Sequence, residues 1–282
     1  MEHQPMISWI VNTLQQVPGV KAIVLGGSRA RGTHTPDSDV DIGLYYDPAV
    51  PLNLPALQQA ARQLDDAARE NLVTETGGWG PWINGGGWLT VQSRPVDLLY
   101  RDLNKVAQVM EQCLAGQVTI DYQPGHPHGF INAIYFSEIA LCQILWDPSD
   151  SITALKKMTL SYPPLLQKAM IGKFFWEASF ALEQCKKGML KQDAVYMAGC
   201  GFRALSCLNL VLFAINECYW MNEKGAAAIA GTLDKAPGQY KSRANRIASF
   251  INEERQSSEQ ACRMLQELIR ETETLLRKEG LA

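Results

Sequence analysis

The segment from Val24 to Tyr46 constrains the fold of this chain more than any other part of the sequence. It reads VLGGSRARGTHTPDSDVDIGLYY, in which an apolar strand ends at a Gly26–Ser28 turn and a polar loop leads to a second apolar strand, Val40–Tyr46. Asp39 and Asp41 open that second strand two residues apart. Side chains at this spacing lie on the same face of a strand. Two carboxylates on one face, close to a Gly-Ser turn, suit a divalent metal that phosphate oxygens also bind.

Three other interpretations compete for these residues. A phosphate-binding P-loop requires a lysine at the position of Thr33. A calcium loop that starts at Asp37 requires a glycine and a glutamate where this chain has Ile42 and Pro48. Both patterns are therefore disfavoured. An ordinary hairpin with a solvated turn of Asp and Ser residues stays open, because such turns are common, but a third carboxylate in a later strand, Asp97, makes it less favoured.

Asp97 lies in the segment Arg94–Tyr100, RPVDLLY, which reads as a strand. Gly27-Ser28, a gap of about ten residues, Asp39-x-Asp41 and this later strand carboxylate together resemble the signature of the nucleotidyltransferase superfamily that includes DNA polymerase beta. The resemblance implies that an acceptor hydroxyl attacks the α-phosphorus of a nucleoside triphosphate, with ATP as the expected nucleotide, and that pyrophosphate leaves.

The resemblance also implies roles for the three carboxylates. Asp39 and Asp41 would hold Mg²⁺ ions that bridge the phosphates. Asp97 would be either a third metal ligand or the general base that takes the proton from the acceptor hydroxyl. In small-molecule members of the family a strand carboxylate of this kind is often the base, so the base is favoured, but both roles stay open.

Residues around the first turn would complete the phosphate site. Gly27 would let the backbone approach the phosphates, and the hydroxyl of Ser28 would donate a hydrogen bond to them. Ser38 is a second candidate donor. Arg29 and Arg31 are candidate cations for the triphosphate, and solvated loop arginines are an equally good interpretation of both.

The second half of the chain offers weaker candidates. Lys224 sits at a predicted helix break and could reach the leaving pyrophosphate, as could Arg203 on the preceding helix. Glu177 lies between aromatic residues on a predicted helix, which makes it the second choice for the general base. For each of these residues an ordinary surface or packing role is favoured.

The segment Thr76–Gly87 is rich in glycine and carries Trp79 and Trp82, with Trp88 directly after it. It is interpreted either as a hairpin packed on the sheet or as the lining of an acceptor pocket. The His126-Pro127-His128 sequence is interpreted as a solvated turn, with a site loop as the alternative.

The element pattern predicts an α+β protein in two parts. Residues 1–150 are expected to form a nucleotidyltransferase domain with a mixed sheet, and residues 151–282 an all-α helical bundle that completes the nucleotide and acceptor cleft. In layout this resembles the aminoglycoside nucleotidyltransferases. Strands are expected at Val20–Leu25, Val40–Tyr46, Trp88–Gln92 and Val96–Tyr100, and helices at Met6–Val17, Leu54–Asn71, Asp102–Ala115, within Phe130–Trp146, and at Pro164–Lys187, Gln192–Met221, Ala244–Asn252 and Glu254–Lys278.

The charge of the chain limits the classes of binding partner that are expected. The net charge of −3 divides into 8 Lys/Arg against 16 Asp/Glu in residues 1–150 and 18 against 13 in residues 151–282. An acidic, metal-binding half and a basic half that helps to hold a triphosphate would produce this division, as would ordinary surface variation. The chain lacks the basic stripe of a nucleic-acid binder, so no nucleic-acid partner is expected.

Targeting and assembly signals are few. No apolar stretch is expected to reach transmembrane length, and the segment Leu208–Ile215 is far too short, so a cytoplasmic location and no membrane partner are expected. The seven cysteines include no C-x-x-C pair, so neither a disulfide framework nor a zinc site is expected. The oligomeric state is left as monomer or homodimer.

Three functional hypotheses follow. The first is an enzyme that transfers a nucleoside monophosphate to a small-molecule acceptor, such as an aminoglycoside or lincosamide antibiotic. The second is a toxin-like or regulatory transferase that modifies tRNA or a protein, and a basic groove leading to the Asp pair would distinguish it. The third is a non-catalytic nucleotide-binding protein, which loss of one of the acidic residues would favour.

Overall fold

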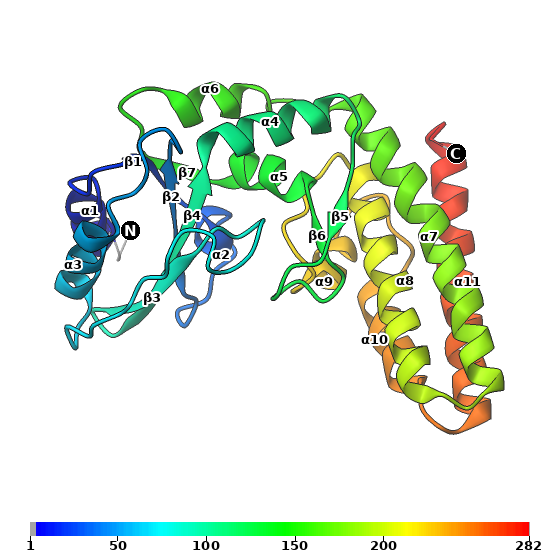
Figure 1. The fold of residues 1–282 in the computed structure, drawn as a ribbon. Coiled ribbons are helices and arrows are strands. Elements are labelled where there is room, and N and C mark those ends of the chain that lie inside the picture. The colour runs from blue at the N-terminus through cyan, green and yellow to red at the C-terminus, as the bar shows by residue number, and fades with distance from the viewer. Residues whose placement is uncertain (1–3, 282) are drawn as a thin grey trace. The chain divides into compact units, whose positions relative to one another are not determined.

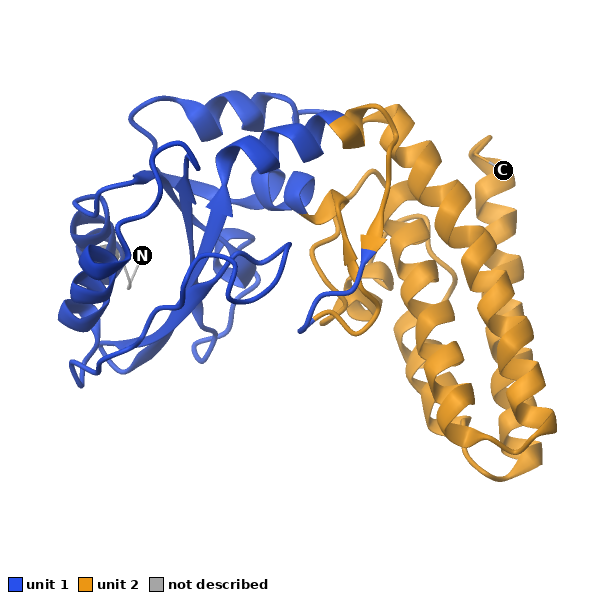
Figure 2. Cartoon of the chain, viewed as in Figure 1, with its two compact units in different colours: residues 1–111, 121–125, 135–161 blue, residues 112–120, 126–134, 162–282 orange. Residues whose placement is uncertain are grey.

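A computed structural model describes residues 4–281 of the chain. These residues form two compact units (Figure 2). Unit 1 contains the chain up to residue 111 together with residues 121–125 and 135–161, and unit 2 contains residues 112–120, 126–134 and the chain from 162 onward. Compactness by itself does not define a functional domain, so the division at residue 150 stays a prediction.

Unit 1 is built around a mixed sheet of five strands, which confirms the predicted fold class (Figure 1). The strand order is β3-β4-β2-β1-β7. The β2–β4 pair is parallel, and the other three pairs are antiparallel. The elements are α1 Gln4–Leu14, β1 Val20–Leu25, α2 Gly27–Ala30, β2 Val40–Tyr46, α3 Leu54–Leu64, β3 Gly86–Val91, β4 Arg94–Asp102, α4 Leu103–Leu114, α5 Ala133–Leu141, β7 Gln143–Trp146 and α6 Ser151–Lys157.

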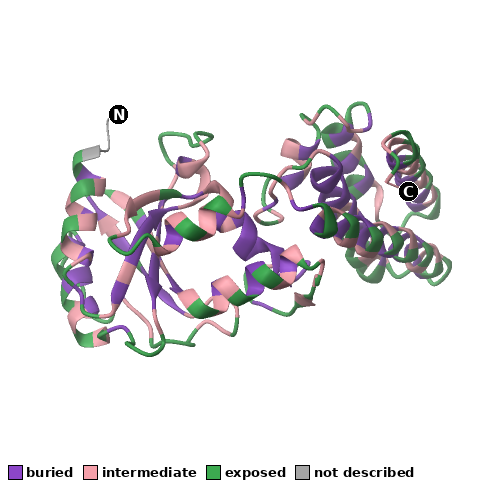
Figure 3. Cartoon of the chain, turned by 90° about the horizontal axis from the view of Figure 1, so that it is seen from above, coloured by how far each residue is buried: buried purple, intermediate pink, exposed green. Residues whose placement is uncertain are grey.

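Alternation along the strands separates a core face from a face that carries the acidic residues. In β2 the side chains of Val40, Ile42 and Leu44 are fully buried, whereas Asp41 between them is only half-buried. Apolar residues of α1 and α3 pack in the same core cluster as these strand residues, so the two helices cover the core face (Figures 1 and 3). A period of two forces every second residue onto the opposite face, and that is where Asp41 points.

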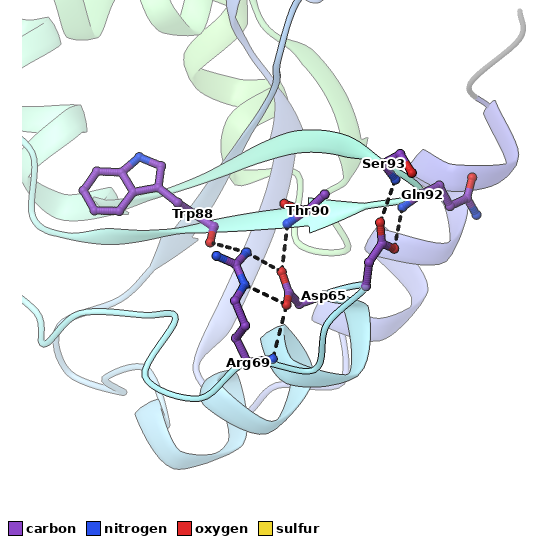
Figure 4. A network of polar contacts seen from close by, with 7 residues as sticks. Asp65, Arg69, Trp88, Thr90, Gln92 and Ser93 are labelled. Carbon is purple, nitrogen blue, oxygen red and sulfur yellow. Dashed lines mark hydrogen bonds and ion pairs between the residues drawn. The ribbon is translucent and has the colours of Figure 1, made fainter.

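Helix α3 ends at Leu64, not at Asn71 as the sequence predicts, because the next residue is used to hold β3. The Asp65 carboxylate accepts hydrogen bonds from the Thr90 amide at 2.9 Å and from the Arg69 Nε at 3.0 Å (Figure 4). Asp65 itself takes an extended conformation at the end of the helix. A carboxylate that binds a neighbouring strand in this way fixes its own backbone outside the helix.

Strand β7 is a second departure from the prediction, which places Trp146 in a helix. Helix α5 stops at Leu141 instead. The Lys156 ammonium donates hydrogen bonds to the carbonyls of Ile139, Ala140 and Cys142 at 3.0, 2.8 and 2.7 Å. A cation on the last carbonyls of a helix satisfies acceptors that have no intrahelical partner. The chain is thereby released to pair as a strand with β1.

Unit 2 is mostly helical, as predicted. It contains α7 Pro164–Leu190, α8 Ala194–Ile215, α9 Ala226–Ala230, α10 Tyr240–Phe250 and α11 Arg255–Lys278, and the short strands β5 Ile120–Asp121 and β6 Phe130–Ile131 pair beside them. The Tyr240 hydroxyl donates to the buried Asn209 Oδ1 at 2.9 Å, which joins α10 to α8. Arg243 binds both carboxylate oxygens of Glu271 at 2.7 Å and joins α10 to α11.

Helix α8 corrects one expectation. With 22 residues it is long and apolar enough to cross a membrane on length and composition alone, and 67% of its most apolar window is buried in this structure. The prediction that no stretch reaches this length is wrong, because it rested on residues 208–215 and left out the mostly apolar residues 194–207 before them. Core helices of soluble proteins have the same length and composition, so α8 by itself does not place the chain in a membrane.

We predict that Asp65→Ala lowers the free energy of unfolding by about 1–3 kcal/mol at pH 7, because it leaves the half-buried Thr90 amide and the Arg69 guanidinium without their acceptor. The hydrogen bond from Arg69 outweighs burial and holds the Asp65 pKa well below its ordinary value. On acidification the unfolded chain therefore takes up this proton first, near pH 4. The contribution of Asp65 should be complete above about pH 5 and should shrink as the pH falls.

Urea denaturation of the wild type and the variant at pH 7 and pH 3 measures both effects. Glu70→Ala is the control, because Glu70 forms a solvent-exposed ion pair with Arg62 at 3.3 Å and should contribute little. An Asp65→Ala deficit that is as large at pH 3 as at pH 7 would contradict the assigned role.

Candidate active site

Three carboxylates meet on the open face of the sheet. In the parallel ladder Asp41 of β2 is directly opposite Asp97 of β4, and Asp39 lies one residue before β2. Each of the three offers an oxygen, and these oxygens lie within 4.8 Å of one another. All three side chains are half-buried, so solvent reaches them. The structure thus brings together the three acidic residues that the sequence singles out.

Position 27 requires a glycine, because the Asp41 carboxylate occupies the space that a side chain at this position would need. Its φ is +61°, in the left-handed region that favours glycine. A Cβ at this position would lie 1.7 Å from Asp41 Oδ2. The Gly26 amide donates to the Asp41 carbonyl at 2.8 Å, so the turn is fixed to the strand that carries the acid. The turn and Asp41 are therefore a single packed unit.

Arg29 positions the loop that leads into β2. Its side chain is buried, with Nε donating to the Asp39 carbonyl at 2.9 Å and a terminal nitrogen donating to the Ser38 carbonyl at 2.6 Å. A second arginine, Arg94 at the start of β4, donates to the Pro36 carbonyl. These contacts hold the backbone on either side of Asp39. They give Arg29 a positioning role, and a contact between Arg29 and phosphate stays a prediction.

The other predicted phosphate-site residues lie around this loop. Ser28 is half-buried in α2, and its carbonyl accepts from the Thr33 amide at 3.0 Å. The Ser38 hydroxyl accepts from the Thr35 amide at 3.0 Å, which closes a turn. Arg31 donates from Nε to the Gly27 carbonyl at 3.3 Å. Their predicted contacts with phosphate stay predictions.

The predicted residues of the helical half lie in unit 2. Lys224 is exposed in the turn before α9. Arg203 on α8 donates to Glu177 on α7, so the second-choice base is already engaged in an ion pair. His128 and Cys207 lie beside Glu177, and their ligand atoms are within 4.8 Å of one another. The Arg203 guanidinium already neutralises the charge of the Glu177 carboxylate. We therefore interpret Glu177, His128 and Cys207 as a polar network inside the bundle.

In the His126-Pro127-His128 loop, His128 is buried and His126 is half-buried, whereas Pro127 is exposed, so the interpretation as a solvated turn holds only for Pro127. Glu223 accounts for the difference: it accepts from the His128 amide at 2.9 Å and pairs with His126 Nδ1 at 3.3 Å. Burial, with the charge of Arg203 as the second cause, lowers the pKa of His128, so its ring is neutral at pH 7. The apolar residues that follow the loop in the sequence indicated that it could be buried. Its contact with Glu223 could not be predicted, because Glu223 is distant in the chain.

Residues 7–78 match the family model of the nucleotidyltransferase domain. This chain carries a nucleotidyltransferase domain. The matched residues include the Gly27 turn, Asp39 and Asp41, and Asp97 follows them on the adjacent strand. The match makes the chain a transferase enzyme whose reaction class is nucleotidyl transfer.

Other comparisons add less. No curated protein matches the chain. Among solved structures, a nucleotidyltransferase-like protein from Exiguobacterium sibiricum is 11% identical, with a TM-score of 0.43, and the alignment covers 96% of this chain and 74% of that one. A likeness at this level carries no information about substrate.

We predict that Gly27→Ala damages the nucleotidyltransferase domain more than Gly32→Ala does. Both glycines have positive φ, +61° and +70°, so each substitution costs about 1–2 kcal/mol of backbone strain. At Gly32 a Cβ would meet nothing within 4 Å, whereas at Gly27 it would collide with the Asp41 carboxylate. The excess destabilisation of Gly27→Ala, measured by urea denaturation, should therefore come from Asp41.

A double-mutant cycle isolates this contact. In an Asp41→Ala background the collision is absent, so Gly27→Ala should cost no more than Gly32→Ala. Equal costs for Gly27→Ala with and without the Asp41 carboxylate would show that the close approach does not determine the glycine.

Proposed function

We propose that this enzyme transfers a nucleoside monophosphate from a Mg²⁺-bound nucleoside triphosphate, with ATP as the expected nucleotide, to a hydroxyl group of a small-molecule acceptor, and releases pyrophosphate. The observation that carries the proposal is the meeting of Asp39, Asp41 and Asp97 on an open sheet face, beside a turn that matches the nucleotidyltransferase domain. Carboxylate oxygens are ligands for the divalent ions that bind phosphates, and the domain match concerns nucleotidyl transfer. Together they support phosphoryl chemistry over a purely structural role for the three aspartates.

The three carboxylates fit a magnesium ion. Mg²⁺ prefers oxygen ligands and is typically held by one or two carboxylates together with substrate phosphates. Asp39 and Asp41 would be its ligands, with Asp97 as a candidate third. When bound, Mg²⁺ supplies positive charge that neutralises the phosphates and orients them. The ion would also relieve the repulsion between carboxylates that face each other across the β2–β4 pair.

The turn and the loop would position the triphosphate. Gly27 presents backbone without a side chain at the edge of the acidic cluster, and the Ser28 hydroxyl would donate to a phosphate oxygen. Ser38 would be a second donor on rotation out of its turn, and Arg31 and Lys224 are the candidate cations. In-line transfer demands accurate placement more than covalent help, which suits a site held by Arg29 and by the glycine packing.

Asp97 would act as the general base. The proton of the acceptor hydroxyl passes to a carboxylate oxygen of Asp97, the acceptor oxygen forms a bond to the α-phosphorus, and the bond from that phosphorus to the pyrophosphate oxygen breaks. Its position opposite Asp41 supports this role, because it places the base beside the ligands that hold the reacting phosphate.

The charge of the chain supports a small cationic acceptor. Residues 1–150 carry 16 acidic against 8 basic side chains, and an antibiotic with protonated amines is one such acceptor. This enzyme would then confer antibiotic resistance from the cytoplasm, as a monomer or homodimer. The alternative, modification of tRNA or of a protein, would call for a basic surface near the acids, and the charge of this half is opposed to it.

The test combines product detection with paired variants. Wild-type protein is incubated with Mg²⁺, each labelled triphosphate and a panel of hydroxylated acceptors, and both pyrophosphate and labelled adducts are measured. We expect the Asp39→Asn/Asp41→Asn variant to lose Mg²⁺-dependent nucleotide binding in calorimetry and to lose adduct formation, while its circular dichroism is unchanged. Nucleotide affinity equal to the wild type in this variant would remove the two aspartates from the site.

Asp97→Asn separates base from metal ligand. If Asp97 is the base, Mg²⁺–ATP affinity should stay within about threefold, and single-turnover transfer should fall by roughly 10²–10⁴, the usual size of general-base catalysis. If it is chiefly a metal ligand, nucleotide affinity should fall together with turnover. Wild-type turnover in this variant would exclude both roles.

A further inference from the structure

A large aromatic side chain stands next to the acidic cluster. In the antiparallel β3–β4 ladder Trp88 is directly opposite Asp97, and Asp97 is in turn opposite Asp41 in the β4–β2 ladder. Side chains that are directly opposite in a sheet lie on the same face. The indole and the two carboxylates therefore form a row across three adjacent strands.

This tryptophan is exposed although its strand is not. Trp88 is 60% exposed, whereas Leu89 and Val91 on the other face of β3 are buried. The ring of Trp79 stacks on it, with ring centroids 4.5 Å apart and an interplanar angle of 28°. A stacked indole pair open to solvent leaves apolar surface uncovered, and such surface beside polar groups is characteristic of a binding site.

The indole pair is held in place by its surroundings. Gly86 lies on the same face as Trp88, and a Cβ there would be 1.9 Å from the Leu98 carbonyl oxygen and 2.7 Å from the Trp79 ring, so its lack of a side chain makes room for both. The buried Gln123 binds the Trp79 carbonyl at 2.6 Å and the amide of Trp82 at 3.3 Å, which fixes the loop. A site arranged before its ligand arrives avoids the entropic cost of ordering it.

The strand itself is anchored from the side opposite to the indole. A terminal nitrogen of Arg69 lies 3.5 Å from the Trp88 carbonyl, and Asp65 holds the Thr90 amide (Figure 4). Figure 4 shows the indole of Trp88 pointing away from this network. The backbone of β3 is thus fixed while the ring face stays open.

The order of the strands indicates which part of the reaction faces the indoles. The Gly27 turn follows β1, and the sheet then runs through β2 with Asp41 and β4 with Asp97 to β3 with Trp88. Neighbouring strands are about 4.8 Å apart, so Trp88 lies some three spacings from the turn. In the proposed reaction the triphosphate lies at the turn and at Asp41. Trp88 then lies on the other side of Asp97, the proposed base, which is the side from which the acceptor would approach.

We propose that Trp88 and Trp79 form a stacking platform for a saturated, hydroxylated six-membered ring of the acceptor, and that this contact presents a ring hydroxyl to Asp97. The inference rests on the proposed function. An apolar indole face next to carboxylate oxygens suits a ring with C–H bonds on its faces and hydroxyl groups at its rim. A sugar or cyclitol ring has this chemistry, whereas the phosphates of the nucleotide do not.

Fluorine NMR of the full chain labelled with 5-fluorotryptophan tests the platform without a known acceptor. The probes are myo-inositol and methyl α-glucopyranoside at millimolar concentrations, with adenosine as the competing flat ring. We expect both hydroxylated rings to shift the Trp88 and Trp79 resonances saturably and adenosine to have little effect. Trp88→Ala should weaken ring binding roughly tenfold, and Trp88→Phe should retain most of it.

Trp176→Ala is the matched control. Trp176 on α7 is 64% exposed and stacks on Phe180 with ring centroids 5.2 Å apart, but it lies in unit 2, far along the chain from the acids. Its replacement should leave ring binding unchanged. Failure of both rings to move the Trp88 resonance, or a response to adenosine alone, would overturn the proposal.

Calorimetry with Mg²⁺–ATP distinguishes this inference from the function on which it rests. Trp88→Ala should bind Mg²⁺–ATP within about twofold of the wild type, because the platform does not contact the nucleotide. A large loss of nucleotide affinity in this variant would assign the indoles to the nucleobase instead. If the wild type binds none of the Mg²⁺-bound nucleoside triphosphates, the proposed function fails, whatever the ring probes show.

Discussion

The parallel pairing of β2 with β4 is the constraint on which the acidic cluster depends. It sets Asp41 opposite Asp97, an arrangement of like charges that is unfavourable in a sheet without a cation between them. The surrounding structure opposes that repulsion with backbone contacts: the Gly26 amide binds the Asp41 carbonyl, and the apolar neighbours of Asp41 are locked in the core. The repulsion between these two carboxylates lowers the stability of the fold locally, and such a local loss of stability is typical of a functional site.

Polar side chains that bind the backbone of other segments fix the loops and helix ends of unit 1. Asp65 binds the amide of Thr90, Arg29 binds the carbonyls before β2, and Lys156 binds the last carbonyls of α5. On the face of β4 that carries Asp97, the buried Arg101 forms two bonds to Glu138 at 2.8 and 2.6 Å and so fastens α5 to the sheet. The loops near the acids thus have fixed ends, although their middles are exposed.

Much of this could be predicted from the sequence, because it depends on local pattern. The alternation of Val40–Tyr46 gives both the strand and the face of Asp41, and the helices of unit 2 follow from long apolar repeats and their glycine or proline breaks. The helix expected from Asp102 is likewise found, and the Asp102 carboxylate accepts hydrogen bonds from the amides of Asn104 and Lys105 at its start. The early end of α3, strand β7 and the contacts of the histidine loop with Glu223 were not predictable, because each depends on a partner distant in the chain. The same holds for the neighbourhood of Trp88 and Asp97, which only the strand register reveals.

The anchoring of the loop before β2 has a consequence for how the protein can change. Arg29 and Arg94 grip carbonyl oxygens, which every residue type provides, and not the side chains of Ser38, Asp39 or Pro36. The exposed stretch from Thr33 to Asp37 can therefore accept substitutions while the position of Asp39 is preserved. The backbone position of this loop does not depend on its side chains. Natural variation, or substitutions introduced in the laboratory, can therefore change the side chains near the three aspartates without moving the aspartates themselves.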